Sequence, residues 1–231
     1  KNLSQKFPDA SEYSFKNITL NIASGEHICL SGSISSGRTV LSNTLAGLNS
    51  SYQGAITIDG YSLRDLDLSN LRDKIGKNVS QEDIFEGTII ENILLGKPNT
   101  RYEDAIWAIN TVGISDQINN MPQGVNTAML SGGKGLDLDL VNKIILARCL
   151  AKRPNLLILN DYFHGFMKSE RLKLISELVD KKHKWTMIVV SNDPVIMAAC
   201  DRVIIMDDGQ IKKEGRFQDL LKSEELNKLI A

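Results

Sequence analysis

The sequence feature that most constrains the fold is a short glycine-containing segment at residues 32–39. The segment reads GSISSGRT, which has the G-x-x-x-x-G-basic-Ser/Thr spacing of a phosphate-binding P-loop. An apolar run at residues 27–31 predicts a buried strand before it, and apolar positions over residues 39–48 predict a helix after it. Inward-pointing N–H groups and the partial positive charge of a helix N-terminus bind phosphate in such a loop. The residues expected to surround phosphate are Gly32, Ser33, Ser35, Ser36, Gly37, Arg38, Thr39 and Val40.

The basic residue of the motif is an arginine, Arg38, where the usual residue is lysine. The lysine normally reaches the β- and γ-phosphates as a compact charge. Arginine keeps the charge, but its planar guanidinium is bulkier, so the exchange is not conservative at a tight site. The sequence therefore predicts the P-loop fold and leaves two alternatives open: a loop that binds nucleotide, and a P-loop shell that holds none.

The composition favours one large α/β domain. A chain of 231 residues is long enough for a hydrophobic core. The 27 basic and 28 acidic residues leave a net charge of −1, which gives no sign of the basic face that binds nucleic acid. No apolar segment approaches the roughly 20 residues that span a bilayer. Cys29, Cys149 and Cys200 have neither disulfide nor metal-ligand spacing, so we expect them to be small buried apolar residues.

Two short runs in the second half of the chain are apolar throughout, at residues 156–159 and 187–190. This pattern is typical of parallel strands that are buried on both faces. The helix predicted over residues 169–182 lies between them, as the crossover between two parallel strands requires. The runs therefore predict a parallel sheet that includes the strand before the P-loop.

Other segments predict elements around that sheet. Alternating apolar residues over 13–22 and a short run at 55–60 predict an antiparallel β layer, while residues 84–148 have mostly helical periodicity. The turn sequence DDG at residues 207–209 predicts a hairpin. The last segment, residues 217–230, predicts one charged amphipathic helix.

Five further landmarks follow one another in a fixed order. They are FPD at 7–9, SQED at 80–83, FEGTIIENI at 85–93, ARCL with PNLLILND at 147–161, and DDGQIKKEG at 207–215. In this order they resemble the nucleotide-binding domain of ATP-binding cassette (ABC) transporters of the exporter type, over essentially the whole chain. The resemblance implies a P-loop NTPase with a RecA-like α/β core, an antiparallel β layer and a helical subdomain. It also implies ATP and Mg²⁺ as ligands.

The resemblance assigns roles to residues outside the P-loop. Phe7 corresponds to the aromatic residue that stacks on adenine. Gln81 corresponds to the glutamine that senses Mg²⁺ and the attacking water, and Thr39 to the second residue that meets the metal. Bound ATP would therefore meet Phe7, the P-loop and, through Mg²⁺, Thr39 and Gln81.

Three catalytic positions depart from the family pattern. The family has an aspartate that holds Mg²⁺ through water and then a glutamate that polarises the attacking water; here these positions are Asn160 and Asp161. Asparagine brings no charge to a Mg²⁺–phosphate cluster, and a base misplaced by about 1 Å can cost about 10²-fold in rate. The family's switch histidine corresponds to Asn192, which cannot take up a proton as imidazole does. We therefore expect little hydrolysis.

The signature that caps the opposite domain's nucleotide also departs from the family. Residues 130–133 read LSGG, but in the family an alanine lies eleven residues after the signature leucine, and Ala147 lies eleven residues after Leu136. We therefore expect the signature helix to start near Leu136, with residues 131–133 in the preceding loop. Acidic residues suit a helix N-terminus, but they repel a triphosphate. The degenerate signature is Leu136, Asp137, Leu138, Asp139 and Leu140. A shifted, working signature at 130–133 is the alternative.

The function implied by this resemblance is that of a degenerate nucleotide-binding domain. We expect residues 1–231 to be one such domain, a fragment that follows a membrane-spanning domain, and to lie at the cytoplasmic face of the membrane. It would act through contact with the membrane-spanning domain and beside a second ABC domain, without nucleic acid, and be a monomer when isolated. The alternatives are an active ATPase of the same family and a P-loop regulatory module without a transport role.

Overall fold

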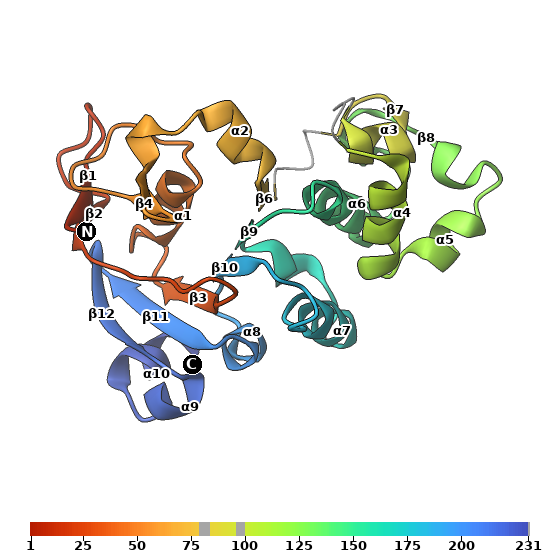
Figure 1. Ribbon diagram of the computed structural model, residues 1–231. Coiled ribbons are helices and arrows are strands. Elements are labelled where there is room, and N and C mark those ends of the chain that lie inside the picture. The colour runs from red at the N-terminus through yellow and green to blue at the C-terminus, as the bar shows by residue number, and fades with distance from the viewer. Residues whose placement is uncertain (79–83, 96–99, 231) are drawn as a thin grey trace. The chain divides into compact units, whose positions relative to one another are not determined.

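The computed structural model describes residues 1–78, 84–95 and 100–230 (Figure 1). Gln81 and its neighbours at 79–83 lie outside the described residues. The chain divides into two compact units. The first comprises Lys1–Arg72, Ile158–Asp161 and Lys181–Ala231, and the second comprises Asp73–Leu157 and Tyr162–Asp180.

A mainly parallel sheet forms the centre of the first unit. Strand β3 (His27–Gly32) lies between β10 (Thr186–Val190) and β11 (Arg202–Asp207) and is parallel to both. All six residues of β3 are buried, as the apolar run predicted. Strand β12 (Gln210–Gly215) is antiparallel to β11 and completes the predicted hairpin. The last residues of β9 (Leu156–Asn160) follow β10 in the strand order.

Two small antiparallel sheets supply the predicted β layer of the first unit. Strand β1 (Leu3–Gln5) pairs with β2 (Phe15–Ile18), and β4 (Thr57–Ile58) pairs with β5 (Tyr61–Ser62). Strand β2 is shorter than the predicted run over 13–22. The backbone amide of Asn17, a residue with φ 56°, donates to Ser4 Oγ, so the regular ladder is interrupted at this point.

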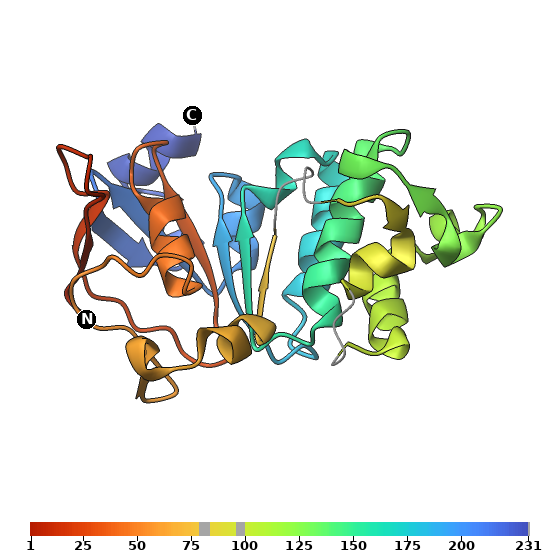
Figure 2. The same ribbon diagram turned by 90° about the horizontal axis from the view of Figure 1, so that it is seen from above.

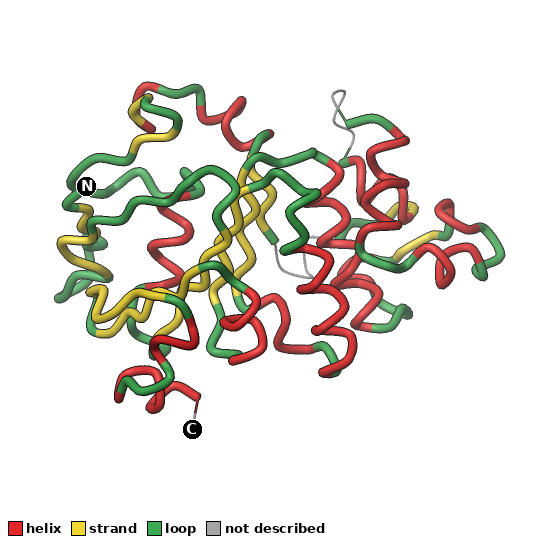
Figure 3. Tube along the Cα trace, turned by 60° about the horizontal axis from the view of Figure 1, so that its bottom comes forward, coloured by secondary structure: helices red, strands yellow, loops and turns green. Residues whose placement is uncertain are grey.

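Helices cover the strands of the first unit (Figure 3). The chain ends in two short helices, α9 (Phe217–Leu220) and α10 (Glu224–Ile230), so the prediction of one helix over 217–230 is wrong. The break lies at Ser223, whose Oγ accepts from the backbone amide of Leu226, because a serine side chain that bonds the backbone competes with helix continuation. The other helical segments of this unit are α1 (Arg38–Leu45), the turn η1 (Leu63–Asp65), α2 (Leu68–Asp73, whose last residue falls in the second unit) and α8 (Pro194–Ala199).

The second unit is mostly helical and is built around α6 (Leu138–Ala151), whose residues from 143 to 151 are all buried. Helices α3 (Ile89–Leu94) and α4 (Tyr102–Thr111) pack against α6 (Figure 2). The unit is larger than the helical arm expected over 84–148. Its remaining elements are β6 (Ile75–Lys77), β7 (Gly87–Thr88), α5 (Ser115–Asn119), η3 (Gly124–Asn126), β8 (Ala128–Met129), η4 (Ser131–Gly133), η5 (Tyr162–Gly165) and α7 (Lys168–Leu178).

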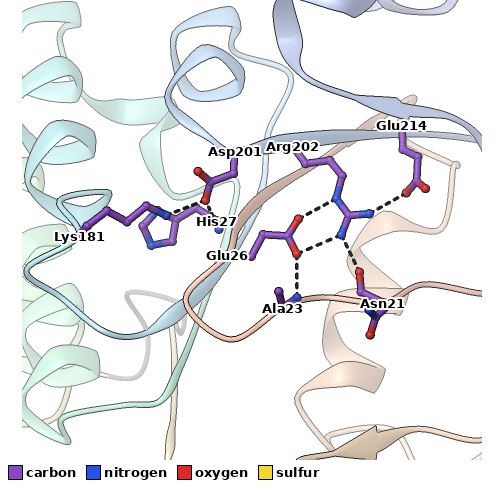
Figure 4. A network of polar contacts seen from close by, with 8 residues as sticks. All are labelled: Asn21, Ala23, Glu26, His27, Lys181, Asp201, Arg202 and Glu214. Atoms are coloured by element: carbon purple, nitrogen blue, oxygen red, sulfur yellow. Dashed lines mark hydrogen bonds and ion pairs between the residues drawn. The ribbon is translucent and has the colours of Figure 1, made fainter.

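A network of charged residues lies where β3 and β11 begin (Figure 4). The Arg202 guanidinium bonds both carboxylate oxygens of Glu26, at 2.8 and 3.2 Å, and the carbonyl oxygen of Asn21 at 2.6 Å. It also reaches Glu214 on β12 at 3.2 Å. One guanidinium therefore ties three segments of the first unit together.

All three cysteines are buried and free, as predicted. Among the residues that the structure describes, no helix combines the length and the apolar character needed to cross a bilayer.

Candidate functional site: the phosphate loop and the strand ends beside it

The predicted strand–loop–helix arrangement is confirmed at the P-loop. Residues 33–37 form the turn between β3 and α1, and α1 begins at Arg38. Two positions of the loop require glycine, because backbone atoms of neighbouring segments lie where a Cβ would be. A Cβ on Gly37, where φ is 84°, would lie 2.0 Å from the carbonyl oxygen of Ser14, and one on Gly32 would lie 2.2 Å from that of Met206. The two glycines of the motif are therefore fixed by packing within the first unit.

The Arg38 side chain is the central charged group of the site. Only 8% of the residue is exposed. Its Nη1 donates to Asn192 Oδ1 at 2.6 Å, and its Nη2 lies 3.6 Å from Asp161 Oδ1. The guanidinium therefore contacts Asp161, which follows β9, and Asn192, which lies two residues after β10. The structure thus brings three of the predicted site residues together.

The amide oxygen of Asn192 accepts three hydrogen bonds. Besides the Arg38 guanidinium, the donors are Ser31 Oγ at 2.9 Å and the Gly32 backbone amide at 3.1 Å. The amide nitrogen of Asn192 donates to the Gly32 carbonyl at 3.0 Å. Asn192 is thus bonded to both backbone groups of the glycine that opens the P-loop, and it brings no charge or titratable proton.

The position of the family's metal aspartate, Asn160, belongs to a group of neutral side chains. Its Oδ1 accepts from Ser42 Oγ at 2.9 Å, and its Nδ2 donates to Asn43 Oδ1 at 3.4 Å. Sequence reasoning missed Ser42 and Asn43. The available signal was that both are polar residues within the first two turns of α1.

The described side chains do not fit Mg²⁺ as a resident ion. Magnesium favours carboxylates and phosphate oxygens. Two carboxylates lie at the described strand ends: Asp161 is 56% exposed and paired with Arg38, and Asp207 accepts a hydrogen bond from Ser33. Asn160 and Asn192 offer only amide oxygens, both engaged in hydrogen bonds. Thr39 is exposed, so its hydroxyl is accessible to a metal but brings no charge, and no cluster of His, Cys, Asp and Glu suited to a metal occurs in the described parts of the chain.

The other expected phosphate and adenine contacts vary in exposure. Phe7 lies in the segment between β1 and β2 with 41% of its surface exposed, so its ring is accessible to a base. The Ser33 hydroxyl donates to Asp207 at the end of β11, a second neighbour that sequence reasoning missed. Ser36 is buried, and its Oγ has no hydrogen-bond partner among the described residues. That hydroxyl is a donor of the P-loop that remains to be satisfied.

The start of α6, in the second unit, agrees with the predicted register. The helix begins at Leu138 with Asp137 as the N-cap residue, and Asp139 lies in its first turn. Residues 131–133 form the separate turn η4 before it, so they do not cap α6. Gly133 packs closely against the helix, because a Cβ there would lie 2.6 Å from Val141 Cγ2. The start predicted near Leu136 is confirmed to within two residues.

The family model described as "ABC transporter" matches residues 15–163, a span that runs from β2 through the P-loop and the helical unit to the residues after β9. The chain belongs to the ABC transporter family. It is 29% identical over 209 residues to the uncharacterized ABC transporter ATP-binding protein YwjA of Bacillus subtilis, with 90% of this chain and 36% of that protein covered. It is 30% identical over 228 residues to the ATP-dependent permease MDL1 of Candida albicans, covering 94% of this chain and 32% of that protein.

This ABC transporter family chain therefore spans about a third of the length of these relatives. Its fold is similar to that of a solved bacterial Atm1-family ABC exporter with ATP bound. The TM-score is 0.88 at 22% identity, covering 96% of this chain and 39% of that one. The predicted α/β P-loop NTPase fold, with a central sheet and a helical subdomain, is confirmed.

Proposed function

We propose that the chain is the nucleotide-binding domain of an exporter-type ABC transporter whose own P-loop site hydrolyses ATP very slowly or not at all. The family match and the exporter fold support the transport role. The domain would act through contact with a membrane-spanning domain at the cytoplasmic face of the membrane, beside a second ABC domain. Residues 87–93, which are similar to the exporter segment next to the membrane domain, favour this role over a regulatory module without transport.

The observation that carries the proposal is the set of contacts made by Arg38. Its guanidinium donates to Asn192 and is paired with Asp161, the two positions where the family has the switch histidine and the catalytic glutamate. A general base must lie within about 2.6–3.2 Å of the proton that it takes. A carboxylate held at Arg38 and one methylene shorter than glutamate is poorly placed for that task.

The signature positions support weak activity independently of the P-loop. In the family, each ATP lies between one P-loop and the other domain's signature. Here Leu136, Asp137, Leu138, Asp139 and Leu140 would face a partner's triphosphate. Two unit charges 4 Å apart repel by about 1 kcal/mol in water and about 4 kcal/mol near a protein surface. The two aspartates therefore oppose an ATP-bound homodimer, and we propose a monomer in solution.

Steady-state phosphate release by the purified domain tests the proposal. Removing one well-placed catalytic group typically costs about 10²–10³-fold. We therefore expect wild type and Asp161→Ala to release phosphate at the same background rate. The combined variant Asn160→Asp, Asp161→Glu, Asn192→His should gain little, because the site also needs a partner's signature. A turnover near 1 s⁻¹, at the low end of ordinary enzymes, that is lost in Asp161→Ala would establish the active ATPase instead.

A further inference from the structure

We infer that the phosphate loop holds a nucleoside polyphosphate without a divalent cation, with the Arg38 guanidinium as the counter-charge. The inference rests on the proposed nucleotide-binding role and concerns which group at the same site balances the negative charge of the phosphates. Its basis is the mismatch between Mg²⁺, which the family uses, and the side chains that the strand ends present. Of the two side chains that Arg38 contacts here, Asn192 is neutral and Asp161 is a carboxylate.

The donors around Asn192 are the groups that a phosphoryl oxygen would use if it displaced the Asn192 amide oxygen. The Ser31 hydroxyl, the Gly32 amide and the Arg38 guanidinium converge on one oxygen atom, Asn192 Oδ1, at 2.6–3.1 Å. A phosphoryl oxygen carries more negative charge than an amide oxygen, so in place of Asn192 Oδ1 it would make stronger hydrogen bonds with the same three donors. Arg38 belongs to the first turn of α1, and the positive end of this helix favours the same anion.

The side chains that would hold a metal are occupied or uncharged. Asn160 is bonded to Ser42 and Asn43, and Asp161 is paired with Arg38. A cation recruited beside Arg38 would have to compete for Asp161 with a guanidinium that lies 3.6 Å from that carboxylate. The charge that Mg²⁺ brings to phosphate elsewhere is supplied here by Arg38.

Titration calorimetry of the chain with ATP, in excess EDTA and in excess Mg²⁺, tests the inference. We expect the dissociation constant in EDTA to equal or fall below that in Mg²⁺. An affinity at least tenfold higher in Mg²⁺ would overturn the inference, and so would the absence of ATP binding in both buffers. Neither result bears on the lack of hydrolysis, which phosphate release measures separately.

Two variants assign the effect to named groups. Arg38→Met removes one charge-assisted contact and should weaken binding in EDTA by about 10–100-fold, whereas Arg216→Met, at the exposed N-cap of α9, should leave it unchanged. Asn160→Asp restores the missing carboxylate and should make binding at least tenfold tighter in Mg²⁺ than in EDTA. Equal loss in both arginine variants, or an Asn160→Asp variant still indifferent to Mg²⁺, would contradict the assignment. Circular dichroism shows whether each variant is folded.

Discussion

Replacing Asn92 by alanine should destabilise the helical unit more than any exposed substitution in it. Asn92 is fully buried in α3. Its Oδ1 accepts from the Phe85 amide at 3.2 Å and from Arg148 Nη2 at 3.0 Å. Its Nδ2 donates to the carbonyls of Phe85 and Thr88 at 3.0 and 3.1 Å. The side chain thus uses both donors and both acceptor positions.

The size of the effect follows from these four bonds. Three are neutral and contribute about 1 kcal/mol each, while the bond from Arg148 contributes about 1.5–3 kcal/mol. Arg148 keeps its bond from Nε to the Asn92 carbonyl, at 2.7 Å, in the variant. Because the groups that lose Asn92 as a partner relax in part, we expect the free energy of unfolding to fall by about 3–5 kcal/mol. The typical free energy of unfolding of a protein is about 5–15 kcal/mol.

The two tryptophans allow the helical unit to be measured by itself. Trp107 belongs to the second unit and Trp185 to the first. In a Trp185→Phe background, the urea midpoint from Trp107 fluorescence should fall by about 1 M or more in Asn92→Ala, given m-values up to about 3 kcal/mol per M. Asn119→Ala, at an exposed position of α5, is the matched control. A midpoint shift no larger than that of the control would refute the reasoning.

Three further predictions concern the first unit and the assembly. His27 is 1% exposed, and its burial lowers its pKa below the usual value of about 6.5. Below pH 6.5 the His27 imidazole is protonated in the unfolded chain but stays neutral in the folded chain. The free energy of unfolding should therefore fall from pH 7 to 5.5. His27→Gln should flatten this slope in thermal melts, unlike the exposed control His164→Gln. Arg202→Met should cost about 2 kcal/mol in chemical denaturation, whereas Lys181→Met should cost under about 1 kcal/mol because the Lys181–Asp201 pair is exposed. Light scattering should give a monomer at micromolar concentration with or without ATP, and an ATP-dependent dimer would contradict the degenerate signature.

Local patterns predicted most of the elements around the site. The glycine spacing and the apolar run before it fix the P-loop between β3 and α1, because both signals lie within twenty consecutive residues. The start of α6 was also predictable, from spacing to Ala147. The break at Ser223 was missed because a side-chain bond to the backbone ends the helix, and amphipathic periodicity does not report it.

Contacts between residues far apart in the chain could not be predicted from the sequence. Arg38 and Asn192 are separated by 154 positions, and only the parallel arrangement of β3 and β10 brings them together. Motif reasoning named both residues, but it did not predict that the Arg38 guanidinium bonds Asn192. The role of Asn92 could not be predicted for a similar reason. Its segment resembles an exporter motif, but Arg148 becomes its partner only because α3 packs against α6.

Single-turnover hydrolysis tests the central claim most directly. The domain, in excess over γ-³²P-labelled ATP and with Mg²⁺ present, is sampled over hours, so that even one slow event per site is counted. We expect the same slow loss of label in wild type and in Asp161→Ala, because neither places a base on the attacking water. Label released by wild type at least tenfold faster than by Asp161→Ala would show that this site catalyses hydrolysis and would contradict the account.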